Sequence, residues 1–328
     1  MIITKTPLRI SFAGGGTDLA AFYEAEGYGA VVSTTIDKYV YLALHPYFEK
    51  KYLLKYSKTE MVDNPADIQH PLIRESLLIT NTTTPVEITS FADIPSSGTG
   101  LGSSSAFCVG LLHALHILNG KHLSNHKYAE MACDIEIGRL KEPIGKQDQH
   151  ASAIGGLNYI RFNADGSVFT QRISLPPKVL HELEGNLLMF YTGITRSAKT
   201  ILQEQQTNTT NDAEKRMTLV RMRDMADELK DALHAHDLTR FGSILNEGWQ
   251  LKRQLAGGIS NPVIDEYYDR AIRAGALGGK LLGAGGGGFL LFYVPQEKHE
   301  AVRKELADLR EMPFMFDMQG TRIAHIDN

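Results

Sequence analysis

The segment 95–105, PSSGTGLGSSS, constrains the fold of this chain more than any other feature. Its glycines permit positive φ angles and let a ligand approach the backbone closely. The segment runs directly into the apolar stretch 106–118, which is predicted to be a helix. Free N–H groups at the start of a helix attract phosphate, and serine hydroxyls add donors. Because a flexible linker does not usually continue into core, we expect a phosphate-binding loop, although it lacks the Gly-Lys-Ser/Thr ending of a Walker A motif.

A second glycine-rich segment, GAGGGG at 283–288, formally matches the dinucleotide-binding pattern GxGxxG. That pattern requires a helix after the glycines. The residues that follow here, 289–294, are apolar and aromatic and are predicted to form a strand. We therefore reject a nicotinamide-dependent oxidoreductase. The glycines either let the backbone approach a substrate or phosphate, or form a tight turn before a buried strand.

Predicted strands and helices mix irregularly along the chain, which favours an α+β fold over a doubly wound sheet. Strands are expected at 2–12, 31–44, 85–91, 157–162, 186–191 and 289–294, with a short one near 322–326. Helices are expected at 106–118, 124–140, 213–236, 238–255 and 262–274, and from Pro295 onward. The Gln-, Asn- and Thr-rich run 203–212 is predicted to be an exposed loop. The stretch 163–177, which ends in two prolines, is the candidate domain junction.

Composition limits the classes of function. Of the 328 residues, 43% are hydrophobic and 22% are charged, and the formal net charge is −4. This balance gives no reason to expect nucleic acid or a membrane as a partner. The two cysteines, Cys108 and Cys133, lie in apolar segments without metal-binding spacing, so we predict buried thiols in a reducing compartment. The N-terminal residues lack a secretory pattern, and a cytoplasmic protein is expected.

Three acidic residues are candidates for chemistry. Asp148, in GKQDQH, can accept the proton of an acceptor hydroxyl or orient it, although a solvated loop position is the stronger explanation for a single Asp taken in isolation. Glu136 lies on a predicted helix face of small and apolar residues, where a carboxylate is costly unless a donor or a cation such as Mg²⁺ meets it. Its alternative is a partly exposed position at the edge of that face. Asp18 follows the glycines of GGGTD and either binds a polyhydroxylated ligand or caps the helix expected at 19–26.

Three segments together resemble a known family. TPLRISFAGGGTD at 6–18, IPSSGTGLGSSSAF at 94–107 and LLGAGGGGF at 281–289 stand in the order and spacing of the motifs of the galactokinase, homoserine kinase, mevalonate kinase and phosphomevalonate kinase (GHMP) superfamily. Over nearly its whole length the chain most resembles the D-glycero-D-manno-heptose 7-phosphate kinases. The resemblance implies two domains, at 1–175 and 176–328, with the active site between them. The first is expected to be ribosomal protein S5 domain 2-like and the second ferredoxin-like.

The resemblance also implies roles for individual residues. Asp148 resembles the catalytic Asp of the family, and Arg9 resembles the basic residue that pairs with it. Ser104, with Ser103 as its rival, and Glu136 are expected to hold Mg²⁺. The residues expected to bind the ATP phosphates are Pro95, Gly98, Gly100, Leu101, Gly102, Ser103, Ser104 and Ser105. Those expected to bind the acceptor are Asp18, Gly15, Gly16, Lys146, Arg196, Gly286 and Gly287.

Three features bear on the identity of the acceptor. Galactokinases carry Glu-His where this chain has Gly15-Gly16, which argues against galactose and leaves room for a larger acceptor. Homoserine kinases lack the catalytic Asp, so the presence of an Asp at 148 argues against that branch. A sugar phosphate also needs a cation for its own phosphate. The candidates are Lys146, Arg196 and Lys199, with Arg196 preferred and a surface position as the alternative for each.

The resemblance therefore implies ATP- and Mg²⁺-dependent phosphorylation of D-glycero-D-manno-heptose 7-phosphate. The anomeric hydroxyl would be phosphorylated, giving the 1,7-bisphosphate for nucleotide-heptose biosynthesis. One alternative is a kinase of another acceptor, such as fucose or a heptose phosphorylated elsewhere. Another is a non-catalytic sensor of sugar and ATP, against which the joint presence of Asp148, Glu136 and Arg9 argues. The expected partner is a small-molecule sugar phosphate, and a homodimer is left open.

Overall fold

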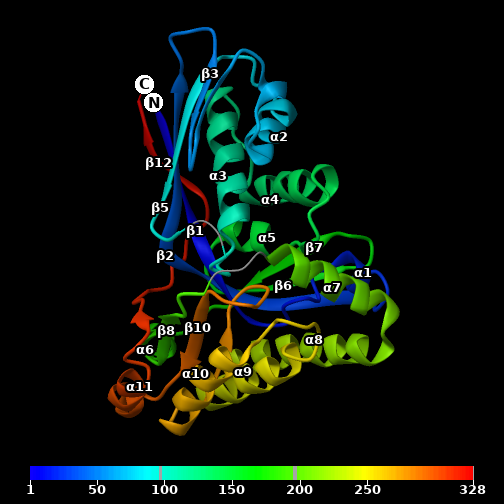
Figure 1. The fold of residues 1–328 in the computed structure, drawn as a ribbon, viewed down its shortest axis with the longest axis vertical. Helices are drawn as coiled ribbons and strands as arrows, with labels where there is room; N and C mark the ends of the chain where they lie inside the picture. The colour runs from blue at the N-terminus through cyan, green and yellow to red at the C-terminus, as the bar shows by residue number, and fades with distance from the viewer. Residues whose placement is uncertain (96–97, 195–197, 328) are drawn as a thin grey trace.

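The computed structural model describes residues 1–95, 98–194 and 198–327, and the strands in these residues form two sheets (Figure 1). The larger, 8-stranded sheet has the order β12-β1-β2-β5-β3-β4, and β6 and β7 extend it beside β2. The smaller, 4-stranded sheet has the order β11-β8-β10-β9. In Figure 1 the larger sheet stands upright with α2, α3 and α4 on one face, and the smaller sheet lies below it with α8 to α11. This mixture of sheets and helices is the α+β architecture that was predicted.

The bounds of the elements are as follows. The strands of the larger sheet are β1 (Ile2–Ala13), β2 (Tyr28–Pro46), β3 (Tyr52–Lys55), β4 (Thr59–Val62), β5 (Val86–Ala92), β6 (Asn158–Asn163), β7 (Val168–Arg172) and β12 (Arg322–Ile326). Those of the smaller sheet are β8 (Leu187–Tyr191), β9 (Gly278–Leu281), β10 (Phe289–Tyr293) and β11 (Arg310–Glu311). The helices up to residue 185 are α1 (Ala20–Tyr23), η1 (Pro65–Asp67), α2 (Pro71–Ile79), α3 (Ser103–Leu118), α4 (Asn125–Cys133), the π-helix η2 (Asp134–Arg139), α5 (Gln147–Ile154) and α6 (Pro177–Gly185). The later helices are α7 (Ala198–Asn211), α8 (Ala213–His234), α9 (Leu238–Lys252), α10 (Pro262–Arg273), η3 (Gln296–Lys298) and α11 (His299–Glu305).

Helix α3 packs closely against the two central strands of the larger sheet. Gly110 permits this approach, because a Cβ at that position would lie 2.6 Å from Thr6 Oγ1 on β1. Leu111 of α3 is buried in a cluster that includes Leu42 of β2, and the burial of each such side chain contributes roughly 1.5–3 kcal/mol. Strands β1 and β2 pair over nearly their whole length, with Arg9 opposite Thr35. The packed strands therefore fix Arg9 in position next to the start of α3.

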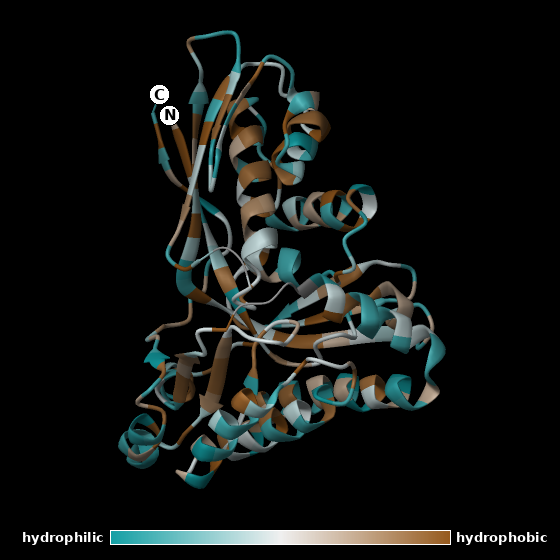
Figure 2. Ribbon diagram, viewed as in Figure 1, coloured by the Kyte–Doolittle hydropathy of each residue, from teal (hydrophilic) through white to brown (hydrophobic). Residues whose placement is uncertain are grey.

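The smaller sheet has an apolar core of its own. Strands β8 and β10 are strongly hydrophobic (Figure 2), and Phe190 and Phe292 on them are at most 1% exposed. Trp249 of α9 and Tyr268 of α10 belong to the same buried cluster. The two helices thus cover one face of this sheet and bring the C-terminal end of α9 to β9, which precedes the second glycine run.

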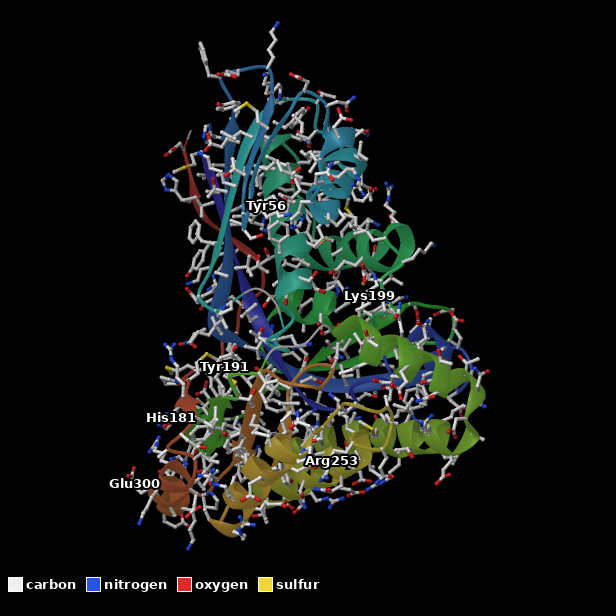
Figure 3. All side chains as sticks on the ribbon, in the orientation of Figure 1. Tyr56, His181, Tyr191, Lys199, Arg253 and Glu300 are labelled. Atoms are coloured by element: carbon white, nitrogen blue, oxygen red, sulfur yellow. The ribbon has the colours of Figure 1, made fainter. Side chains whose placement is uncertain are left out.

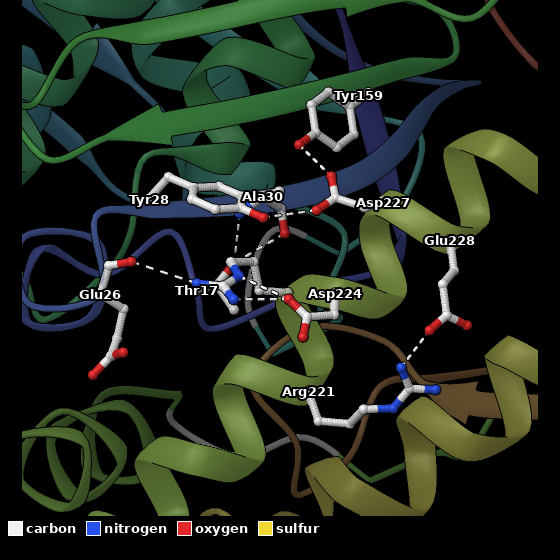
Figure 4. A network of polar contacts seen from close by, with 10 residues as sticks. Thr17, Glu26, Tyr28, Ala30, Tyr159, Arg221, Asp224, Asp227 and Glu228 are labelled. Atoms are coloured by element: carbon white, nitrogen blue, oxygen red, sulfur yellow. Dashed lines mark hydrogen bonds and ion pairs between the residues drawn. The ribbon is translucent and has the colours of Figure 1, made fainter.

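Asp227 joins α8 to the larger sheet (Figure 4). Its carboxylate accepts hydrogen bonds from Tyr28 of β2 at 2.8 Å and from Tyr159 of β6 at 2.6 Å. Arg223, one turn earlier on α8, lies over the Tyr28 ring with its guanidinium carbon 4.4 Å from the ring centroid. These contacts hold the helices of the C-terminal half against the first sheet.

The structure confirms the predicted strands and most of the predicted helices, with shifts at their ends. The helix after the glycine–serine loop begins at Ser103, inside the loop, rather than at 106. The helix expected at 124–140 consists of α4 followed by η2. The candidate junction 163–177 contains β7, which pairs with β6. The last strand, β12, pairs with the outer edge of β1, so the chain returns to the larger sheet.

The prediction of an exposed loop at 203–212 is wrong, because these residues lie mostly in α7. Ile201, Gln205 and Thr209 recur every four residues and are at most 7% exposed. Packing against neighbouring elements thus overrides a composition that is weakly helical and polar. Both cysteines are free and buried, as predicted. None of the described helices combines the length and apolarity needed to cross a membrane.

Candidate active site

Arg9 and Asp148 form a bidentate ion pair at the centre of the site. Arg9 comes from β1, and Asp148 comes from the first turn of α5. Arg9 Nε lies 2.7 Å from Asp148 Oδ1, and Arg9 Nη2 lies 2.8 Å from Asp148 Oδ2. The side chain of Arg9 is 5% exposed and that of Asp148 is 24% exposed. The parallel bonds orient the carboxylate, which remains the more accessible member of the pair.

The glycine–serine loop enters α3 beside this pair. Gly102 has a φ of 76° at the N-cap of α3, a conformation that glycine adopts without strain. A Cβ at Gly102 would lie 3.2 Å from Arg9 Cγ and 3.3 Å from Asp148 Oδ2. Arg9 Nη1 also donates to the Gly100 carbonyl at 2.5 Å. Arg9 therefore contacts both the carboxylate and the loop.

Glu136 is buried beside the first turn of α3. Its carboxylate accepts hydrogen bonds from Ser104 Oγ at 2.8 Å, from Ser105 Oγ at 2.7 Å and from Gln149 Nε2 at 2.6 Å. Burial raises the pKa of Glu136, and these three donors partly oppose that rise. Glu136 is 1% exposed, which excludes the alternative of an edge position. A carboxylate on an apolar helix face needs a donor or a cation beside it, and these three hydrogen bonds supply the donors.

The residues at this point fit a magnesium ion. Mg²⁺ is usually held by one or two carboxylates, by phosphate oxygens of the substrate and by water. Glu136 and Ser104 supply a carboxylate and a hydroxyl at the N-terminus of α3, where phosphate is also favoured. The rival Ser103 has a buried Oγ without a hydrogen-bond partner among the described residues. The described residues contain no group of three or more metal-binding His, Cys, Asp or Glu side chains.

Asp18 is held by backbone donors in the same region. Its Oδ1 accepts from Gly16 N–H at 3.0 Å, and its Oδ2 accepts from Gln147 N–H at 3.2 Å. Burial raises the pKa of Asp18, and the nearby charge of Asp148 raises it further. Asp18 does not cap the short helix α1, whose N-cap is Leu19. Its carboxylate is instead positioned at the wall of a cavity.

The two glycines before Asp18 leave different amounts of room. Gly16 has a φ of 101°, and a Cβ there would lie 2.2 Å from Gln205 Nε2. A Cβ at Gly15 would make only an ordinary contact, 3.7 Å from Ser11 Oγ. The backbone conformation therefore disfavours a side chain at position 16, where the amide of Gln205 would also have to move, whereas position 15 opens onto the site.

The second glycine run packs against the glycine–serine loop. A Cβ at Gly100 would lie 2.3 Å from the Leu282 carbonyl oxygen, and a Cβ at Gly283 would lie 2.3 Å from Gly100 Cα. A Cβ at Gly288 would lie 2.6 Å from the Thr99 carbonyl oxygen. Strand β10 follows the run, as predicted, so the arrangement is not a dinucleotide-binding fingerprint. The glycines instead allow two backbone segments from the two halves of the chain to touch.

These groups surround one cavity of about 320 Å³. The predicted site residues that line it are Arg9, Gly15, Gly16, Asp18, Gly98, Gly100, Leu101, Gly102, Ser103, Ser104, Ser105, Glu136, Asp148 and Gly287. The candidate cation Lys199, on α7 (Figure 3), also lines the cavity, and its ammonium lies 3.1 Å from the Glu142 carboxylate. Its side chain is 52% exposed, which places it at the rim.

Four predicted site residues are not among the described residues that line the cavity. Lys146 Nζ donates to the Gly166 carbonyl at 2.6 Å and is thereby held outside the lining. Gly286 N–H donates to a main-chain carbonyl of the loop before α10. Pro95 is exposed at the entrance to the loop. Arg196 lies outside the residues that the structure describes.

The cavity contains further polar residues that the sequence did not reveal: Ser11, Gln205, Lys252 and Lys280. Lys252 lies in the last turn of the helix predicted at 238–255, where a lysine is usually on the surface. Gln205 lies in the run that was predicted to be a loop. The sequence does carry a signal for Lys280, because a lysine directly before two leucines and the glycine run needs a partner if it is buried with them.

The fold and site match proteins of known family. The family model of the GHMP kinases N terminal domain matches residues 71–156, and that of the GHMP kinases C terminal region matches residues 229–310. The chain is 30% identical to the D-glycero-alpha-D-manno-heptose 7-phosphate kinase of Campylobacter jejuni, and the match covers 98% of each chain. A bifunctional fucokinase/GDP-fucose pyrophosphorylase of Arabidopsis thaliana is 26% identical over 94% of this chain and 31% of its own length.

Solved structures give the same result. A D-glycero-D-manno-heptose 1-phosphate kinase from Bacteriodes thetaiotaomicron superposes with a TM-score of 0.80 and 26% identity, covering 100% of both chains. A putative sugar kinase from Campylobacter jejuni superposes with a TM-score of 0.79 and 27% identity, covering 99% of this chain and 98% of that one. The full-length sequence match, the two family models and the shared fold agree, and the chain therefore belongs to the GHMP kinases, a family of phosphotransferases.

Proposed function

We propose that this protein is an ATP- and Mg²⁺-dependent kinase of D-glycero-D-manno-heptose 7-phosphate that phosphorylates the anomeric hydroxyl. The observation that carries the proposal is the single cavity that Asp148, Arg9, Glu136 and the glycine–serine loop share. It combines a candidate base, a cation and a phosphate-binding loop, which are the parts that phosphoryl transfer requires. The choice of acceptor rests on the full-length similarity to the heptose 7-phosphate kinase.

The proposed reaction is a direct in-line transfer. The anomeric oxygen of the acceptor forms a bond to the γ-phosphorus of ATP, and the bond between that phosphorus and the β–γ bridging oxygen breaks. The hydroxyl proton passes to the Asp148 carboxylate, and ADP leaves with the electron pair of the broken bond. Arg9 orients Asp148 and stabilises negative charge on the attacking oxygen. The product is the 1,7-bisphosphate.

The start of α3 is the proposed site for the ATP phosphates. The backbone of the loop donates to phosphate oxygens, and the Ser104 hydroxyl and Glu136 carboxylate would hold Mg²⁺. The ion, when bound, neutralises charge on the phosphate oxygens. Among the described residues, the unpartnered Ser103 Oγ adds a further donor for a phosphate oxygen.

The other end of the cavity is the proposed acceptor site. Asp18 offers carboxylate oxygens to sugar hydroxyls, and Gly15 leaves open space beside it. Ser11 Oγ is buried without a partner among the described residues and is available to a hydroxyl of the acceptor. The backbone conformation at Gly16, which disfavours a side chain, also agrees with the absence of the galactokinase Glu-His pair.

A second candidate acceptor is the heptose that already carries a phosphate at carbon 1. It is supported by the solved structure of a protein named as a heptose 1-phosphate kinase, which superposes over the whole chain. The two candidates share the heptose and differ in which carbon bears the phosphate.

An ADP-release assay with Mg-ATP tests the proposal. The panel of acceptors is D-glycero-D-manno-heptose 7-phosphate, the 1-phosphate, free heptose, fucose, galactose and mevalonate. Turnover on the 7-phosphate alone supports the proposal, and turnover on the 1-phosphate alone supports the second candidate. Turnover on fucose alone discards the heptose assignment and keeps the kinase. Binding of sugar and ATP without turnover on any acceptor supports a sensor.

A further inference from the structure

Two lysines in the cavity wall have no role in the reaction as described so far. Lys252 is the last residue of α9, and Lys280 lies on β9. Both line the cavity, and their exposed fractions are 7% and 5%. Buried lysines are rare unless an anion or several acceptors satisfy them.

Their hydrogen bonds leave most of their donors unused. Lys252 Nζ donates to the Gly283 carbonyl, and Lys280 Nζ donates to the Phe12 carbonyl at 3.0 Å. An ammonium group has three donors. Neither lysine forms an ion pair with a carboxylate of the described residues. A buried ammonium without a counter-ion is costly, and burial, followed by the charge of Lys252, lowers the pKa of Lys280 well below its usual range. Because no carboxylate of the described residues pairs directly with either lysine, this wall can accept an anion from a bound ligand.

The position of Lys252 identifies the kind of anion. Its partner Gly283 packs on Gly100, whose carbonyl accepts from Arg9. Lys252 thus lies where the second glycine run meets the glycine–serine loop, near the Arg9–Asp148 pair. Lys280 ties β9 to β1 through Phe12, so it holds the two sheets together at the same wall. The anions of the proposed reaction at this point are phosphate oxygens.

We propose that Lys252 binds a phosphate oxyanion during the reaction and is a further catalytic residue, with Lys280 as the positioning residue behind it. This inference rests on the proposed function. The phosphate has two sources, the γ-phosphoryl group of ATP and the phosphate that the acceptor already carries. A lysine ammonium suits either, because it acts as a compact charge that does not require one fixed geometry.

The surroundings of Lys252 make this role dependent on pH. The charged groups that face it are Arg9 on β1, Asp18, Asp148 on α5 and Lys280 on β9. Burial, and next the charge of Arg9, lower the pKa of Lys252 to about 8, although the two carboxylates raise it. The ammonium is present below that pH and is lost above it. We therefore expect kcat/KM, which reports the free enzyme, to fall as pH rises through about 8.

The test compares wild type with Lys252→Met and Lys252→Arg, and uses Lys230→Met as the control. Lys230 is a half-buried lysine on α8 that lies over the Tyr159 ring, away from the cavity lining. Calorimetry gives the ratio of Kd values for Mg-ADP and for Mg with a non-hydrolysable ATP analogue. Steady-state kinetics gives the ratio of kcat/KM for heptose 7-phosphate and free heptose. If Lys252 binds a phosphate, Lys252→Met should lose about tenfold or more of one preference. That preference is either for the ATP analogue over ADP or for heptose 7-phosphate over free heptose.

The two ratios distinguish between the possible phosphate ligands of Lys252. Loss of the triphosphate preference identifies the γ-phosphoryl group as the ligand, and loss of the preference for phosphorylated acceptor identifies the acceptor phosphate. Lys252→Arg should keep the preference and lose the fall in kcat/KM near pH 8, because a guanidinium does not titrate there. If Lys252→Met keeps both the nucleotide Kd ratio and the acceptor kcat/KM ratio of wild type, the proposal is overturned. If that variant does not fold, an unchanged fall near pH 8 in Lys252→Arg overturns it.

The calorimetric comparison of the two nucleotides does not depend on the identity of the acceptor. If wild type binds nucleotide but phosphorylates no acceptor of the panel, the proposed function fails. The ratio of nucleotide Kd values then decides the role of Lys252 alone, and an unchanged ratio in Lys252→Met overturns that role. The melting temperature of Lys252→Met should be no lower than that of wild type at neutral pH, because the substitution removes a buried charge.

Discussion

Arg9 and Asp148 are 139 positions apart in the chain, and yet they meet through two parallel hydrogen bonds of 2.7 and 2.8 Å. The third arm of the same guanidinium contacts the Gly100 carbonyl in the glycine–serine loop. The base of the proposed reaction and the loop for the phosphates of ATP are thus fixed to one side chain. Movement of either one would require a change at Arg9.

Asp148→Asn should lower kcat by about 10²–10⁴-fold, because the variant cannot accept the hydroxyl proton. The Kd of Mg-ATP should change by less than about threefold, since Asp148 is not part of the proposed phosphate site. Steady-state kinetics and calorimetry measure the two quantities. Asp165→Asn, in an exposed turn, is the control. A kcat near that of wild type would remove Asp148 from the catalytic role.

Arg9→Lys should retain the positive charge but lose the bidentate geometry. One lysine nitrogen cannot reach both carboxylate oxygens of Asp148 and the Gly100 carbonyl together. Loss of a hydrogen bond to a charged group costs roughly 1.5–3 kcal/mol, so kcat should fall about 10- to 100-fold. Arg161→Lys, at an exposed position on β6, is the matched control. If both variants keep wild-type kcat, charge alone suffices at position 9.

Glu136→Gln should raise the Mg²⁺ concentration needed for half-maximal rate on the order of tenfold. The substitution keeps the size of the side chain and removes the charge that is proposed to hold the ion. The measurement is a Mg²⁺ titration of the initial rate at constant free ATP. Glu130→Gln, on the exposed face of α4, is the control. An unchanged Mg²⁺ requirement would place the ion elsewhere.

The raised pKa of Glu136 also predicts how stability depends on pH. A carboxyl whose folded pKa lies above its unfolded value favours the folded state at low pH, and that contribution is lost as pH rises through the folded pKa. Without Mg²⁺, Glu136→Gln should therefore melt above wild type at neutral pH. The difference should shrink as the pH is lowered through the raised pKa. Thermal unfolding at several pH values measures it, and a difference that grows on acidification would contradict this reading.

Gly100→Ala should disrupt the contact between the two glycine segments. Its Cβ would lie 2.3 Å from the Leu282 carbonyl oxygen, and the φ of 76° is unfavourable for alanine. Gly120→Ala is a matched control, because Gly120 also has a positive φ, 68°, but a Cβ added there would meet no atom within 4 Å. Both variants incur the backbone cost of about 1–2 kcal/mol. Only Gly100→Ala should also weaken Mg-ATP binding, by about tenfold or more by calorimetry. Equal Kd values in the two variants would show that this contact does not shape the nucleotide site.

The sequence allowed the fold class, the main strands and much of the site to be predicted, because glycine runs and alternating apolar residues carry local signals. The meeting of Arg9 with Asp148 was expected from family resemblance, and no local pattern specifies it. The helix at 198–211 was not predicted, because its buried face depends on neighbouring elements rather than on composition. Lys252 was missed for the same reason, since the burial of a helix end is decided by what packs over it. Lys146 was expected at the acceptor, but the Gly166 carbonyl holds its ammonium outside the described cavity lining.

The most direct test of the proposed function is the identity of the product, measured by phosphorus NMR. Wild-type protein is incubated with Mg-ATP and D-glycero-D-manno-heptose 7-phosphate. The proposal predicts ADP and a bisphosphate in which the original phosphate signal remains and a new one couples to the anomeric proton. A new phosphate at another carbon, or no new phosphate under conditions where the protein binds both substrates, would contradict it.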